Sequence, residues 1–211
     1  MTDRFDVPGA PASCELHIKR SRFVTAVDYV ADRADFMRFL ERRRQALPDA
    51  RHHCWAFVAG PPGDLRFADK NDDGEPRGTA GKPILNVLAH ASLGHVGAVV
   101  TRYFGGIKLG AGGLVRAYSQ CVVEALERLE RRTQFVTEQW TVRLPYTLHA
   151  SVQHALTPTE VILRDTRFDD AVTLVLDVPL GQVDQLGAML DSLGQGAIDR
   201  AVTPDALPGD L

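Results

Sequence analysis

The chain has 211 residues, of which 24 are Lys or Arg and 27 are Asp or Glu, so its formal net charge at pH 7 is −3. With 45% hydrophobic and 24% charged residues, the composition excludes an intrinsically disordered chain, a collagen-like fibre and a disulfide-rich miniprotein. No apolar stretch approaches the roughly 18 residues of a membrane-spanning helix, and the first residues lack the basic and apolar segments of a signal peptide. The three widely spaced cysteines, Cys14, Cys54 and Cys121, favour reduced thiols and therefore a cytoplasmic protein.

The charges are divided unevenly along the chain. Through Val136 the sequence holds 20 Lys and Arg against 16 Asp and Glu, and the remainder holds 4 against 11. A basic first part and an acidic second part are expected of two domains with different partners, although two solvated surfaces that differ by chance would give the same counts. We place the domains at residues 1–134 and 137–211, with a linker over residues 130–134.

The first part combines extended and helical patterns. Residues 1–13 have no periodic pattern, which predicts a loose arm. Residues 15–28 favour strands, after which Asp32 is a candidate cap for a helix that Pro48 ends. The patterns that follow predict a hairpin over residues 53–68, a polar loop over 69–81, a helix over 83–93, a buried strand over 96–101 and a long helix over 114–129.

The second part has a simpler order of elements. Strands are expected over residues 141–144, 161–163, 172–176 and 197–202, with helices over 146–156 and from Pro179 to residue 190. The order βαββαβ is the ferredoxin-like arrangement. Because many unrelated functions occur on this fold, it identifies none of them.

A glycine-rich segment between the strand over 96–101 and the long helix carries the strongest binding signal. Glycine lets another molecule approach the backbone closely, and the first turn of a helix presents free N–H groups that favour an anion. The segment lacks the sequence of a P-loop or of a dinucleotide fingerprint, so a tight crossover that binds nothing is the alternative. The candidate phosphate-binding residues are Gly105, Gly106, Gly110, Gly112 and Gly113, together with the cations Arg77, Lys82, Arg102, Lys108 and Arg116.

Two other clusters could support chemistry instead. His52 and Cys54 share one face of a strand, where an imidazole could activate a thiol, but cysteine is also among the most commonly buried residues. Asp72, Asp73 and Glu75 offer oxygen ligands for Mg²⁺, although an acidic turn held by its own backbone and by nearby arginines would have the same sequence.

Two smaller points concern the residues around Cys54. The imidazoles of His52 and His53 and the Cys54 thiol are too close together in sequence to enclose one metal ion. Trp55 and Phe57 are expected in the core, while an exposed aromatic beside Arg102 could stack on a base.

The glycine-rich segment and its neighbours resemble the IMPACT/YigZ family. The resemblance extends over about residues 15–130, and two departures are visible: Arg77 stands where the family has a small residue, and Lys70-Asn71 looks like a short insertion. The matching residues run from Gly81 through Ile84-Leu85, Leu88, Leu93, Val99-Val100, Arg102, Tyr103-Phe104, Gly105-Gly106 and Leu109 to Gly110, and are joined by Lys19–Phe23, His52–Phe57, Asp72–Pro76 and Gly78–Gly81.

The resemblance implies an α+β fold with two domains. The first is a ribosomal-protein-like domain with a left-handed βαβ crossover, of a type also found in small-metabolite kinases. The second is a ferredoxin-like βαββαβ domain similar to the last domain of elongation factor G. Eukaryotic relatives are tied to translation control through competition at the activator of a starvation-sensing kinase, but they carry a different partner domain. For two-domain bacterial-type members the resemblance implies association with nucleic acid or the ribosome.

We therefore expect a non-catalytic protein that binds RNA or the ribosome through its basic first domain and modulates translation. The acidic second domain offers a surface for a protein partner, and neither a cofactor, a metal ion nor a membrane is implied. Two alternatives stay open: an enzyme or sensor that acts on a small phosphorylated metabolite in the glycine-loop cleft, and a protein-binding adaptor.

Overall fold

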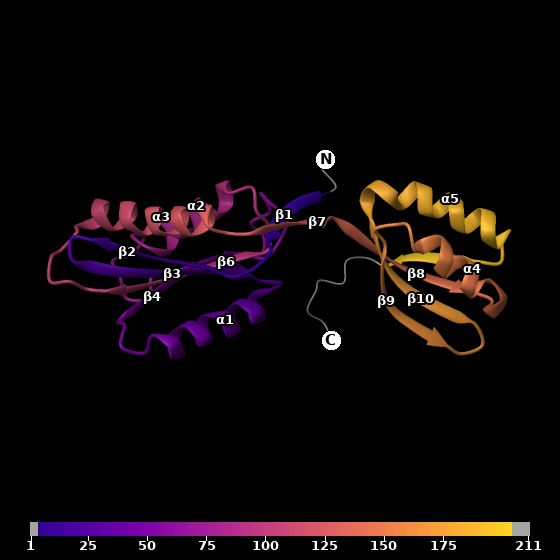
Figure 1. Cartoon of the computed structure of the whole chain (residues 1–211), viewed down its shortest axis with the longest axis horizontal. Helices are drawn as coiled ribbons and strands as arrows, with labels where there is room; N and C mark the ends of the chain where they lie inside the picture. The colour runs from indigo at the N-terminus through magenta and orange to yellow at the C-terminus, as the bar shows by residue number, and fades with distance from the viewer. Residues whose placement is uncertain (1–3, 204–211) are drawn as a thin grey trace. The chain divides into compact units, whose positions relative to one another are not determined.

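In the computed structural model, which describes residues 4–203, the chain divides into two units, each with its own sheet (Figure 1). The first comprises residues 5–134 and the second residues 135–203 together with Arg4. No helix within these residues is long and apolar enough to cross a membrane.

The first unit is built on a five-stranded antiparallel sheet. The strands β3 (Ser21–Tyr29) and β4 (His52–Val58) both pair with β6 (Val96–Tyr103), which lies between them. They therefore run in the same direction, and α1 (Arg33–Ala46) connects them as a crossover. The strand order is β2 (Ala12–Ile18), β3, β6, β4 and β5 (Ala68–Asn71).

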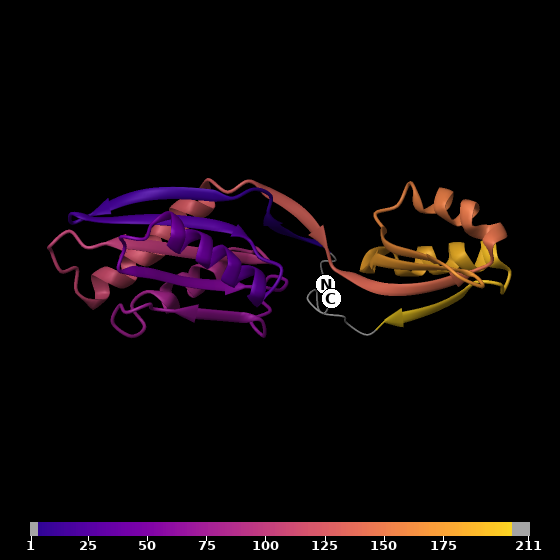
Figure 2. The same cartoon turned by 90° about the horizontal axis from the view of Figure 1, so that it is seen from below.

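Helices cover both faces of this sheet. Figure 1 shows α2 (Gly81–His90) and α3 (Ala111–Glu127) on one face of the sheet and α1 on the other. Figure 2 shows the same unit from the side of α1. Tyr118 of α3 is fully buried against Phe23 in the larger core cluster. Under α1, Trp55 and Phe57 pack against Phe36 in a second cluster, as expected of core residues, so neither is available to a base.

One end of the first unit gathers three loops. The register pairs Tyr103, at the end of β6, with Arg22 and pairs Arg102 with His52. The turn of Lys19 and Arg20 therefore lies at the same end of the sheet as residues 72–80 and residues 104–110, and α2 and α3 begin there. We call these three segments, with the first turns of α2 and α3, the loop end.

The second unit has the expected ferredoxin-like topology. Its antiparallel sheet has the order β11 (Asp199–Thr203), β8 (Thr137–Leu144), β10 (Val172–Pro179) and β9 (Ile162–Phe168). Two helices pack on it, α4 (Tyr146–Leu156) and α5 (Val183–Gly194), the latter preceded by the 3₁₀ turn η1 (Leu180–Gln182). Trp140, Leu174 and Leu186 lie in a core that belongs to this unit. The chain is thus an α+β protein with two domains.

Some elements differ from the sequence-based expectation. The expected arm and linker contain the strands β1 (Arg4–Pro8) and β7 (Arg131–Phe135), which pair as a two-stranded sheet, while residues 1–3 lie outside the described residues. β1 is a short strand of five residues, and β7 is mostly polar and exposed, so neither has a long enough apolar pattern to be recognised from the sequence. Lys70-Asn71 ends β5 and pairs with Ala56 and Trp55, although the sequence predicts a loop there.

Candidate nucleic-acid interface

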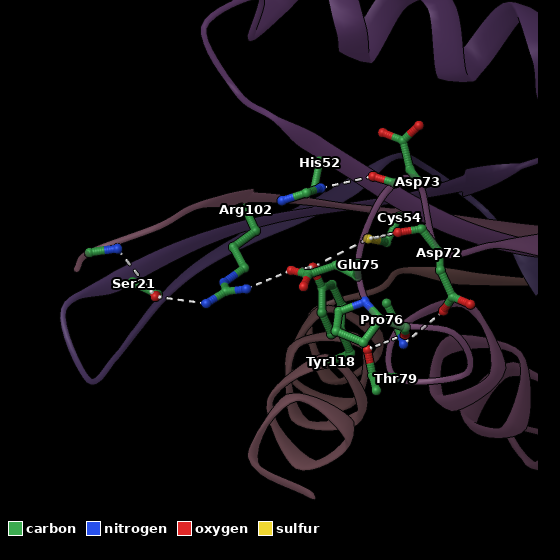
Figure 3. A network of polar contacts seen from close by, with 12 residues as sticks. Ser21, His52, Cys54, Asp72, Asp73, Glu75, Pro76, Thr79, Arg102 and Tyr118 are labelled. Atoms are coloured by element: carbon green, nitrogen blue, oxygen red, sulfur yellow. Dashed lines mark hydrogen bonds and ion pairs between the residues drawn. The ribbon is translucent and has the colours of Figure 1, made fainter. Parts of the chain in front are cut away.

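A buried polar network holds the loop end together (Figure 3). Nη1 of Arg102 donates to Oε1 of Glu75 at 2.6 Å, and only 6% and 4% of the two side chains are exposed. The Tyr118 hydroxyl donates to the same oxygen at 2.9 Å. Ser21 Oγ accepts hydrogen bonds from Arg102 Nη2 and, more weakly at 3.4 Å, from the Gly105 N–H. Because a buried ion is costly without a partner, these contacts fix both charged groups.

Arg102 therefore does not have the role that the sequence suggests. Its charge is neutralised by Glu75 inside the unit, so it cannot serve as an exposed phosphate contact. Strand alternation carried a signal for this: Arg102 shares a face of β6 with Ala98 and Val100, which belong to the core under α2 and α3. The partner is supplied by a loop distant in sequence, which no local pattern indicates.

The acidic residues of the loop 72–80 are likewise engaged within the unit. The Asp72 carboxylate accepts hydrogen bonds from the backbone N–H groups of Gly78, Ala80 and Gly81, with N···O distances of 2.7–3.0 Å. Burial by itself would raise the pKa of this carboxyl, but the three backbone donors outweigh it, and the pKa is lowered. Asp73 accepts the His53 N–H at 2.7 Å and pairs with Arg44.

This arrangement matches an acidic turn held by its own backbone, not a magnesium site. Each of the three carboxylates already has protein donors, and within residues 4–203 no three His, Cys, Asp or Glu side chains are grouped to hold a metal ion. The loop serves to position the first turn of α2 and the partner of Arg102.

A Cys–His nucleophile is not formed either. Cys54 is fully buried, and its Sγ lies 3.0 Å from the Asp72 carbonyl and 3.2 Å from the Tyr118 hydroxyl. Burial raises the pKa of this thiol, which opposes formation of the thiolate. His52 Nδ1 lies 2.8 Å from the Asp73 carbonyl, to which it donates as the protonated ring nitrogen. The imidazole and the thiol are therefore held by different partners.

The other candidate cations lie on the surface of the loop end, to which Arg116 belongs through its side chain: it stands in the second turn of α3 and its guanidinium reaches back to Gly112 in the first turn. These four are exposed: Arg77, Lys82, Lys108 and Arg116. Two further exposed cations, Lys19 and Arg20, lie there as well and were not predicted. None of the six takes part in an ion pair with a carboxylate of residues 4–203. A basic pair between two strand patterns was the signal that could have identified Lys19 and Arg20.

The candidate glycines shape the loop between β6 and α3. Gly106 and Gly110 have positive φ angles of 86° and 75°. Gly105 is packed so closely that a Cβ atom would lie 1.9 Å from the Arg20 carbonyl oxygen. Gly112 and Gly113 lie in the first turn of α3, which has neither a side-chain cap nor an acidic residue. Its N–H groups face the same end as the exposed cations, which favours an anion there.

The loop also presents apolar side chains to solvent. Phe104 is 53% exposed, and Ile107 is exposed three residues further on. An aromatic ring among cations is typical of surfaces that bind nucleic acid.

Comparisons with known proteins agree with this two-domain architecture. The family model described as the Impact N-terminal domain matches residues 19–126, and a domain of unknown function (DUF1949) matches residues 142–197. The class is thus an Impact-type domain followed by a ferredoxin-like domain. The chain belongs to the IMPACT family.

Two curated relatives and one solved structure show how far the similarity extends. The chain is 36% identical to "IMPACT family member YigZ" of Escherichia coli (strain K12) over 192 residues. The aligned region covers 91% of this chain and 94% of that protein. The chain is 33% identical over 185 residues to "IMPACT family member YvyE" of Bacillus subtilis (strain 168), 88% and 84% of the two chains. A crystal structure described as that of "an hypothetical protein" matches with a TM-score of 0.79 and 34% identity, over 97% of this chain and all of that one.

Proposed function

We propose that the chain is a non-catalytic, cytoplasmic protein that binds RNA or the ribosome and modulates translation, with the loop end as its contact surface. The observation that carries this proposal is how charge is distributed there. The acids of the loop 72–80 are bound within the unit, whereas six cations are exposed without a carboxylate partner in residues 4–203. The loop end therefore presents net positive charge to solvent.

RNA phosphates match this surface in charge and in extent. Lys and Arg that neutralise phosphates release counterions, so the affinity falls as salt rises, in proportion to the number of contacts. Cations spread over three loops suit a polymer better than one small phosphorylated molecule. Two shallow hollows of the first unit, one between α2 and α3 and one along α1, do not include the glycine-rich segment.

The test is RNA binding by the full chain over a range of salt concentrations. Lys108→Ala and Arg116→Ala should each weaken binding for all sequences and lower the salt slope by about one. Arg38→Ala is the matched control, because it removes one exposed arginine from α1 on the opposite face of the sheet. An unchanged slope in both loop-end variants, with folding intact, would contradict the proposal.

A second measurement separates free RNA from the ribosome. Sedimentation with ribosomal subunits should carry the wild-type chain into the subunit fraction at low salt. The Lys108→Ala/Arg116→Ala double variant should stay in the supernatant.

A further inference from the structure

The turn between β2 and β3 has an unusual sequence for its geometry. Ile18 pairs with Ser21, so Lys19 and Arg20 are the two central residues of a two-residue hairpin. Their φ angles are 45° and 67°, both in the left-handed region. Hairpins of this kind favour Asn-Gly because most side chains strain such a backbone. Two long basic side chains are therefore placed where folding alone favours other residues.

Next to this turn, Phe104 is held on a fixed support. The Arg102 guanidinium carbon lies 5.5 Å from the centroid of the Phe104 ring, and Arg102 is itself fixed by Glu75 and Ser21. Gly105 packs on the Arg20 backbone, which brings the loop against the turn. A cation beneath an aromatic ring fixes its orientation, and about half of Phe104 stays exposed.

We infer that this corner binds single-stranded RNA: one unpaired base stacks on Phe104, and Lys19, Arg20 and Lys108 contact the neighbouring phosphates. This inference rests on the proposed function and names the class of RNA. A base in a duplex is already stacked between its neighbours, whereas an unpaired base can turn its face to an aromatic ring. The three cations belong to the turn beside Phe104 and to the loop that carries it.

The main experiment compares a single-stranded RNA that contains 2-aminopurine with a duplex of the same length, each added to the full chain. Phe104→Leu keeps an apolar side chain but removes the aromatic face, and should weaken single-strand binding roughly tenfold while the salt slope and the duplex affinity stay unchanged. Phe104→Tyr should keep the affinity. The fluorescence quenching of 2-aminopurine seen with the wild type should disappear with Phe104→Leu.

Two further variants complete the test. Lys19→Asn/Arg20→Gly should lower the salt slope by about two, because it removes two phosphate contacts. Phe168→Leu is the matched control, since Phe168 is a 57% exposed aromatic of the second unit, and its single-strand affinity should equal that of the wild type.

The outcomes separate this inference from the proposed function. Should salt-dependent RNA binding persist with no change in Phe104→Leu and in the turn variant, the single-strand inference fails and the proposed function stands. If Phe104→Leu weakens only the binding of ribosomal subunits and not of free RNA, the loop contacts protein, and the inference also fails. A chain that binds neither single strands, duplex nor ribosomal subunits at low salt would overturn both.

Discussion

Glu75 lies within hydrogen-bond distance of two side chains from different elements, Arg102 at the end of β6 and Tyr118 in α3. Its carboxylate neutralises Arg102 and also accepts a hydrogen bond from the Tyr118 hydroxyl. Burial raises the pKa of that hydroxyl. The arginine in turn supports Phe104. One buried acid therefore connects a strand, a helix and the exposed aromatic ring of the loop end.

Removing this acid should destabilise the first unit strongly. Glu75→Ala leaves a buried guanidinium without its partner, and we expect the free energy of unfolding to fall by about 3–5 kcal/mol. Urea unfolding followed by tryptophan fluorescence measures this, because Trp55 is buried in the same unit. Arg33→Ala breaks an exposed pair with Asp69 and should cost less than about 1 kcal/mol. Equal costs for the two variants would mean that the buried pair adds nothing to stability.

At the scale of elements, the hairpin of β2 and β3 combines a regular ladder with a strained turn. The ladder pairs every residue from Ala12 to Ile18 with its partner in β3. The turn places two non-glycine residues at positive φ, where each costs roughly 1–2 kcal/mol. Such a cost at an exposed site is consistent with a trade of stability for function.

Replacing the turn should therefore stabilise the protein while it weakens RNA binding. We expect Lys19→Asn/Arg20→Gly to raise the free energy of unfolding by about 1–2 kcal/mol, since Asn-Gly suits this turn. Urea unfolding of the variant beside the wild type gives the change. A loss of stability would show that the two basic side chains contribute contacts that offset the strain of the backbone.

The elements were predictable where their signal is local. Asp32 predicts the start of α1, and its carboxylate does accept the Asp35 N–H at 2.7 Å. The apolar patterns likewise predict the order of elements in the second unit. The pairing of β1 with β7 joins segments more than a hundred residues apart, and β7 is largely polar and exposed, so no apolar period marks it.

The candidate site was predictable only in part, for the same reason. The glycines and four of the six exposed cations could be found because residue type and local sequence indicate them, whereas Lys19 and Arg20 were not predicted. The buried network could not be found, because Glu75 is 27 residues from Arg102 and 43 from Tyr118 in the sequence. Local patterns say that Arg102 is a cation, and only the tertiary contact decides that its charge is used inside the unit.

For the whole molecule, the two units differ in charge as well as in fold. The residues after Val136 hold 4 Lys and Arg against 11 Asp and Glu, whereas the residues through Val136 carry an excess of 4 positive charges. The net negative charge of the second unit disfavours a polyanion, whereas the net positive charge of the first unit favours one. Long-range repulsion of this kind is screened by salt.

A fragment of residues 1–136 should therefore bind RNA at least as tightly as the whole chain. It keeps β7, which pairs with β1, so we expect it to unfold cooperatively on its own, and thermal melting checks this first. The difference in RNA affinity between the fragment and the whole chain should be largest at low salt and should decrease as salt screens the charge of the acidic unit. Titrations of both proteins with the same single-stranded RNA measure it. A folded fragment that binds more weakly than the whole chain at every salt concentration would place RNA contacts in the second unit.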